Sequence, residues 1–69
     1  MDRQEIQRLE AYLRRTFKLT AISVRARPRK DDSAEVFIDD EFIGLLFVDD
    51  EEGERSYNFN MAILDIDLG

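Results

Sequence analysis

The most constraining feature of this sequence is a pair of long segments of strand character, residues 42–49 and 56–64, joined by an acidic connection that contains Gly53. Four of the seven aromatic residues lie in this stretch. Two such segments on either side of a short glycine-containing connection are typical of a β-hairpin. Because an isolated hairpin is only marginally stable in water, the rest of the chain must supply further strands and a helix that covers them.

The length of 69 residues allows one small domain, residues 1–69, with a thin core. A chain of this size buries only about 60% of the surface that it exposes when unfolded. Cysteine and histidine are both absent, so neither a disulfide nor a Cys/His zinc cluster can stabilise the fold. No apolar run approaches the roughly 20 residues that cross a bilayer, and no apolar signal-peptide core follows the charged start. We therefore expect a cytoplasmic protein with no membrane contact.

The first half of the chain predicts one helix and two strands. A helix is expected from Asp2 to about Thr16, because Asp2 is a good N-cap and Glu5 follows in the capping-box position. Its apolar stripe consists of Ile6, Leu9, Leu13 and Phe17, and Tyr12 flanks this stripe. Apolar and polar residues alternate within residues 19–27, which predicts a first strand that ends before Pro28. Residues 29–33 are expected to form a polar turn, and residues 34–39 a second strand.

Two connections decide which strand residues share a face. A two-residue loop, either Asp39-Asp40 or Asp40-Glu41, would place Ile43, Leu45 and Phe47 on the face of Val36 and Ile38. An odd loop of about five residues, with Gly53 at positive φ, would add Tyr57, Phe59, Met61 and Ile63 to that face, whereas a four-residue loop would place them on the other. We choose the odd loop because it assembles one continuous face for the helix to cover. Residues 65–69 either extend the last strand or fray.

The predicted fold is therefore α+β: an N-terminal helix packed on a four-stranded antiparallel β-meander. Its expected core consists of Leu9, Leu13, Ile22, Val36, Phe47 and Phe59. One helix can cover only one face of this sheet, yet the third strand is apolar on both faces. The predicted partner-binding residues, on the face away from the helix, are Phe37, Phe42, Leu46 and Val48. Such a patch predicts a small protein-interaction module that binds a second copy or another protein.

The sequence offers little for catalysis, and we expect no enzyme. Absence of histidine and cysteine removes the usual general base and the most capable nucleophile. The acidic residues 49–54 do not match the EF-hand loop, so we interpret them as a solvated turn that holds no metal. No cofactor is expected.

Charge is divided unevenly along the chain. Residues 1–30 carry nine Lys/Arg against three Asp/Glu, whereas residues 31–69 carry one against thirteen. Four cations, Arg25, Arg27, Arg29 and Lys30, could form an alternative site for nucleic acid or another anionic ligand. No aromatic platform is interleaved with them, and the net charge of −6 repels nucleic acid at long range. The interaction module is therefore the preferred interpretation.

Three blocks of the second half resemble a known family. They are Glu41-Phe42-Ile43-Gly44, the acidic connection 50–54 followed by Ser56-Tyr57, and residues 61–68, Met-Ala-Ile-Leu-Asp-Ile-Asp-Leu. Together with the helical N-terminus they are similar to a small uncharacterised alphaproteobacterial family, domain of unknown function 3126. This resemblance implies a bacterial cytoplasmic protein of unassigned role, and it supplies no catalytic residues.

Overall fold

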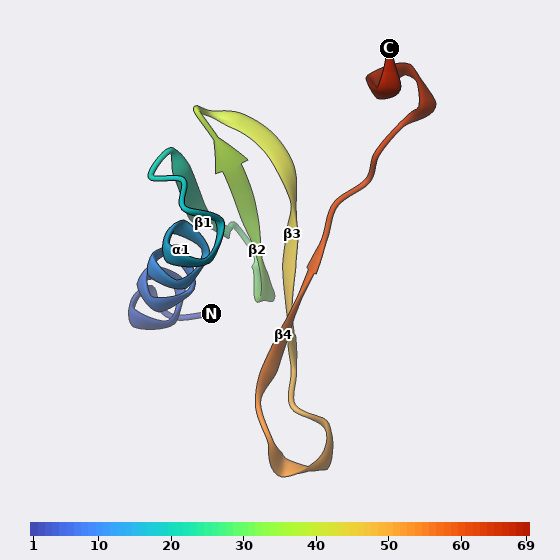
Figure 1. Ribbon diagram of the computed structural model, residues 1–69. Coiled ribbons are helices and arrows are strands. Elements are labelled where there is room, and N and C mark those ends of the chain that lie inside the picture. Colours follow the sequence, from blue (N-terminus) through green and yellow to red (C-terminus); the bar gives the residue numbers. More distant parts are fainter.

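The computed structural model describes residues 1–69, except for the side chain of Glu52. One helix packs on a four-stranded antiparallel sheet of strand order β1-β2-β3-β4, which confirms the predicted α+β fold (Figure 1). The elements are α1 (Arg3–Phe17), β1 (Ile22–Arg27), β2 (Lys30–Ile38), β3 (Glu41–Asp49), the 3₁₀ turn η1 (Glu51–Gly53), β4 (Ser56–Asn60) and the 3₁₀ turn η2 (Asp65–Leu68). In the described part of the chain no helix is long and apolar enough to span a membrane.

Helix α1 begins and ends where local chemistry dictates. The Asp2 carboxylate accepts a hydrogen bond of 2.7 Å from the Glu5 amide, so the predicted N-cap is confirmed. Lys18 closes the helix in the left-handed conformation, with φ of 55°. Arg14 and Arg15 occupy the last turn, where the helix dipole favours cations.

The helix is held against β1, an edge strand of the sheet (Figure 1). The Val24 amide donates to Oε2 of Glu10 at 3.0 Å, and Nε of Arg14 donates to the Ile22 carbonyl at 2.7 Å. Side chains of the helix thus satisfy backbone groups that an edge strand leaves unpaired. One consequence is that the helix lies at the β1 side of the sheet and leaves the β4 side open.

The first hairpin is tighter than the sequence predicts. Strand β1 ends at Arg27, as expected, but β2 already begins at Lys30, so the predicted polar turn over residues 29–33 is wrong. Pro28 and Arg29 alone make the turn, because Arg29 adopts a positive φ of 70°. Proline followed by a residue of positive φ is the pattern of a type II turn.

A β-bulge changes the face assignment of β3. Asp39 and Asp40 form the loop, both at positive φ, as a type I′ turn requires, which confirms the two-residue connection. Phe37 then pairs with Phe42, but Val36 pairs with Gly44, so Ile43 is an extra residue. Beyond this bulge the alternation is reversed. Leu46 therefore lies on the helix-covered face, where it pairs with Ala34. Leu45 and Phe47 lie on the other face, where they pair with Glu35 and Ser33.

The β3–β4 connection compensates for the bulge. Asp49 pairs with Ser56, so the loop has six residues rather than five, with Gly53 at the expected positive φ. An even loop after a reversed β3 still brings Tyr57 and Phe59 to the helix side, opposite Val48 and Leu46. The predicted loop length is wrong, whereas the predicted face of β4 is confirmed.

The core is small and lies between α1 and the first three strands. Its buried apolar residues are Leu9, Leu13, Ile22, Val24, Ala34, Val36 and Leu46. Five of the six predicted core residues are confirmed: Leu9, Leu13, Ile22 and Val36 are buried, and the half-buried Phe59 packs on them from β4. Phe47 is the exception, because the bulge turns it to the face away from the helix.

Candidate interaction surface

A groove remains between α1 and β4 on the side of the sheet that the helix covers only in part. It encloses about 490 Å³. It is lined by Glu5, Arg8, Leu9, Tyr12, Leu13, Arg15, Leu46, Tyr57 and Phe59. We call this hollow the α1–β4 groove. It exists because Glu10 and Arg14 hold the helix at the β1 edge, so that Tyr57 and Phe59 of β4 are covered only in part.

Charge around the α1–β4 groove is not balanced within the chain. Glu5 forms an ion pair of 3.2 Å with Arg55. By contrast, Arg8 and Arg15 make no ion pair with any residue that the structure describes. The guanidinium of Arg15 instead lies 5.6 Å from the ring centre of Tyr12, which is 53% exposed. The groove therefore offers an apolar floor with two available cations at its rim.

Tyr57 and Glu5 link the two sides of the groove. The Tyr57 hydroxyl donates a hydrogen bond to the Glu5 carboxylate, a contact between residues 52 positions apart. This hydrogen bond raises the pKa of Tyr57, and burial and the negative charge of Glu5 raise it further. The contact fixes how far β4 lies from the helix and so defines the width of the groove.

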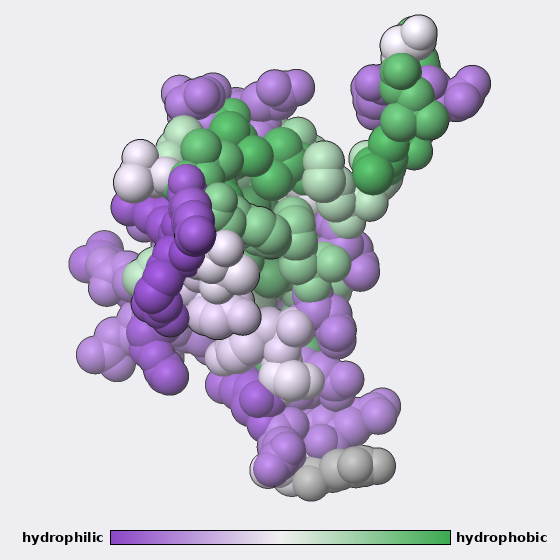
Figure 2. Space-filling model, in the orientation of Figure 1, coloured by the Kyte–Doolittle hydropathy of each residue, from purple (hydrophilic) through white to green (hydrophobic). Residues whose placement is uncertain are grey.

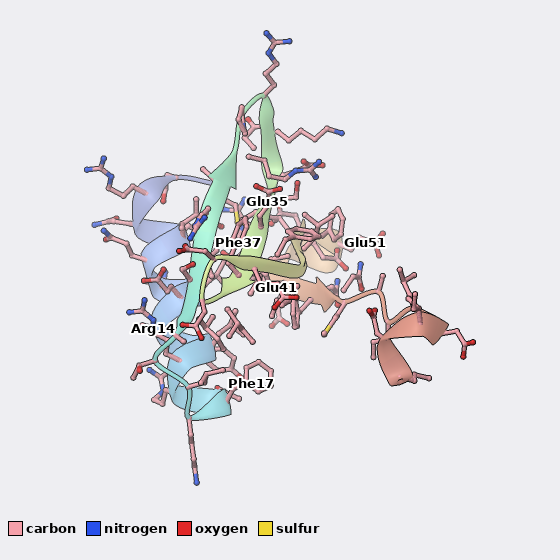
Figure 3. The ribbon with its side chains drawn as sticks, turned by 90° about the horizontal axis from the view of Figure 1, so that it is seen from above. Arg14, Phe17, Glu35, Phe37, Glu41 and Glu51 are labelled. Atoms are coloured by element: carbon pink, nitrogen blue, oxygen red, sulfur yellow. The ribbon has the colours of Figure 1, made fainter. Side chains whose placement is uncertain are left out.

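The chain after β4 projects away from the body of the protein. Strand β4 ends at Asn60, so the prediction that it continues to Leu64 is wrong. Of the two alternatives for the last residues, extension of the strand is excluded, because Asp65–Leu68 form a 3₁₀ turn. Both views place residues 61–68, here called the projecting segment, on the side of the molecule opposite α1 (Figures 1 and 3). The radius of gyration is 12.7 Å, against about 11 Å for a compact domain of this length.

The projecting segment is apolar and exposed. Its five large apolar side chains are exposed by 52% to 83%, and they are Met61, Ile63, Leu64, Ile66 and Leu68. The prediction that Met61 and Ile63 lie on the core face is therefore wrong. Figure 2 shows apolar atoms gathered on the upper part of the main body and again along this segment. Its terminal turn is closed by a hydrogen bond of 3.0 Å, which the Asp67 carboxylate accepts from the Leu64 amide.

The four predicted partner-binding residues do not share one face. Phe37 and Phe42 lie away from the helix, with their rings edge to face and 5.8 Å apart. Leu46 is only 3% exposed and belongs to the helix-side core, and Val48 lies on the same side, opposite Tyr57. The prediction that Leu46 and Val48 join Phe37 and Phe42 is therefore wrong, and the bulge at Ile43 is the reason.

The predicted anion-binding cluster is also divided. Arg25 forms an ion pair with Asp40, and its guanidinium lies 4.0 Å from the ring centre of Phe37. The three other cations, Arg27, Arg29 and Lys30, line a shallow hollow at the first hairpin together with Asp31. One of them, Arg27, donates a hydrogen bond of 2.9 Å to the Ser33 hydroxyl. Arg25 thus contacts Asp40 and Phe37, whereas the other three cations line the hollow at the hairpin, and anion binding by the four stays a prediction.

In the acidic connection, Asp50 forms an ion pair of 3.2 Å with Arg55. The carboxylate of Asp49 accepts a hydrogen bond of 2.9 Å from the Glu51 amide. Among the described residues, which exclude the Glu52 side chain, no three acidic side chains converge on one point. Absence of metal binding at this loop stays a prediction.

The fold and the groove define a class: a small α+β domain with one helix on an open antiparallel sheet and a partly uncovered apolar face. A family model described as "Protein of unknown function (DUF3126)" matches residues 5–67, and the chain belongs to that family. The predicted family resemblance is confirmed. Neither a curated protein nor a solved structure shows significant similarity to the chain.

Proposed function

We propose that this domain is a non-catalytic protein-interaction module that self-associates. The observation that carries the proposal is the projecting segment, whose apolar side chains lie in water in the isolated chain. Apolar surface exposed on a short segment is typical of a region that a partner covers. The α1–β4 groove supplies a second apolar surface on the same chain, so self-association needs no other component.

The energies are adequate for association of moderate strength. Full burial of one aliphatic side chain is worth about 1.5–3 kcal/mol, so four of them would contribute on the order of 6–12 kcal/mol. Association costs an estimated 4–15 kcal/mol in lost translational and rotational freedom. A dimer in which both chains contribute such side chains would gain about twice the contribution from burial, on the order of 12–24 kcal/mol. A surplus of about 8 kcal/mol over the cost corresponds to a dissociation constant of about 1 μM, so the complex would dissociate on dilution.

Sedimentation velocity over a range of protein concentration tests this function. The parent chain should sediment as a monomer at low micromolar concentration and as a larger species at high micromolar concentration. Ile66→Asp should shift this transition to higher concentration without changing the circular dichroism spectrum, since Ile66 is 83% exposed. A parent chain that stays monomeric over the whole range would contradict the proposal.

The alternative function, binding of nucleic acid or another anion through the basic cluster, has less support. Two of its four cations, Arg25 and Arg27, already contact groups of the protein. Retention on an anionic matrix at low salt that disappears in an Arg29→Ala/Lys30→Ala variant would favour this alternative. The cytoplasmic location and the bacterial source stay predictions.

A further inference from the structure

We propose that the projecting segment of one copy occupies the α1–β4 groove of a second copy, and that the exchange is reciprocal. This inference rests on the proposed self-association and names the two surfaces that meet. Each chain would donate one segment and receive another, which is the arrangement of a two-fold symmetric dimer.

The two surfaces match in chemistry. The floor of the groove presents Leu9, Leu13, Leu46 and the Phe59 ring. The segment presents apolar side chains before and within a 3₁₀ turn, in which the Asp67 amide donates to the Leu64 carbonyl at 2.8 Å. Because this turn is closed by a hydrogen bond before binding, less conformational freedom is lost when it docks.

Charges at the two surfaces are complementary. The projecting segment carries two carboxylates, Asp65 and Asp67, and no cation. The groove carries Arg8 and Arg15, which have no ion pair within the described part of their own chain. Docking would therefore bring the segment's anions to the groove's available cations, which gives the complex a dependence on salt concentration.

The geometry favours a second copy over the chain's own groove. In both ribbon views α1 and the projecting segment lie at opposite sides of the molecule (Figures 1 and 3). An extended chain covers about 3.3–3.6 Å per residue, so residues 61–68 can reach well beyond their own domain. The match to the family model covers both the groove residues and the segment up to residue 67.

A mixing experiment tests the exchange on the full chain. Tyr12→Glu alters the groove and Ile66→Asp alters the segment, and both positions are more than half exposed. Either substitution alone should abolish the contact that it alters, a loss of about tenfold for each contact, and a contact that carries both substitutions is lost only once. Each variant alone should therefore dimerise about 100-fold more weakly than the parent, because both contacts of its dimer are lost. An equimolar mixture should dimerise only about tenfold more weakly than the parent, since one intact segment then meets one intact groove. Sedimentation velocity measures all three constants.

Controls separate this inference from the proposed function. Phe42→Asp places the same charge at a 51% exposed residue on the other face, and it should leave association unchanged. Arg8→Glu/Arg15→Glu should weaken dimerisation at low salt and less so at high salt. If the parent dimerises but Phe42→Asp abolishes the dimer and Ile66→Asp does not, self-association holds and the exchange is wrong. A mixture no stronger than either variant alone would also overturn the exchange, and a monomeric parent would overturn both proposals.

Discussion

Phe59 lies directly against Gly44 of the neighbouring strand. A Cβ atom on Gly44 would come within 2.8 Å of Cε1 of Phe59 and within 2.4 Å of the backbone oxygen of Asn60. Only glycine allows β4 to approach β3 this closely at this position. Because Gly44 has no side chain, Phe59 can lie across the groove floor. Gly44 directly follows the extra residue of the bulge, Ile43, so the bulge and the position of β4 depend on the same part of β3.

Replacement of this glycine tests the close approach. Gly44→Ala should destabilise the domain by about 1–3 kcal/mol, because part of the clash is with backbone that cannot rotate away. Urea denaturation followed by circular dichroism measures the change. Asn58→Ala, at an exposed position of the neighbouring strand β4, should stay within about 0.5 kcal/mol of the parent. A Gly44→Ala variant as stable as the parent would show that β4 does not lie this close to Gly44.

The register of β3 predicts opposite results at two adjacent leucines. Leu46→Asp would bury an unpaired charge at a cost of several kcal/mol, which is comparable to the whole stability of about 5 kcal/mol expected for so small a domain. We expect that variant to be largely unfolded by circular dichroism. Leu45→Asp, half-buried on the other face, should remain folded. The reverse outcome would mean that the bulge at Ile43 is absent.

The hydrogen bond between Tyr57 and Glu5 predicts a dependence on alkaline pH. The folded protein holds the phenol proton more tightly than the unfolded chain does, since the pKa of Tyr57 is raised. Its contribution to stability is therefore complete below about pH 10, the unfolded pKa, and is lost as the pH rises through the folded pKa.

Ultraviolet titration measures that pKa directly. Tyr57 is the single tyrosine of a Tyr12→Phe chain, because the sequence contains two. In that background Glu5→Ala should lower the pKa of Tyr57 toward its ordinary value. The matched change Gln4→Ala, at the exposed residue before it, should have no effect. Equal pKa values in all three chains would show that the contact with Glu5 is not formed.

Local chemistry made much of the fold predictable. The helix start depends on Asp2 and Glu5, which are neighbours in sequence, and the second hairpin depends on Asp39 and Asp40. The face of Leu46 was not predictable in this way, because the bulge that reverses β3 is tied to the contact between Gly44 and Phe59. The one available signal was a glycine inside a strand pattern, which often marks a bulge.

The groove was harder to predict than the fold. Its existence depends on where α1 lies along the sheet, and that position is set by hydrogen bonds from Glu10 and Arg14 to β1. Helical periodicity identifies the apolar stripe of a helix but not the strand against which it packs. The sequence therefore showed Tyr12 only as a flank of that stripe and not as part of a groove. The end of β4 at Asn60 was also not predicted, because residues 61–64 are all apolar and would suit a longer strand.

Disulfide trapping between the projecting segment and the α1–β4 groove tests the central claim most directly. The chain has no cysteine, so Ile66→Cys and Tyr12→Cys each introduce a single thiol. The two variants, mixed and oxidised, should give mainly the covalent dimer that joins one copy of each, at high yield and low protein concentration. The same yield from Ile66→Cys mixed with Phe42→Cys would show random collision and would contradict the proposed exchange.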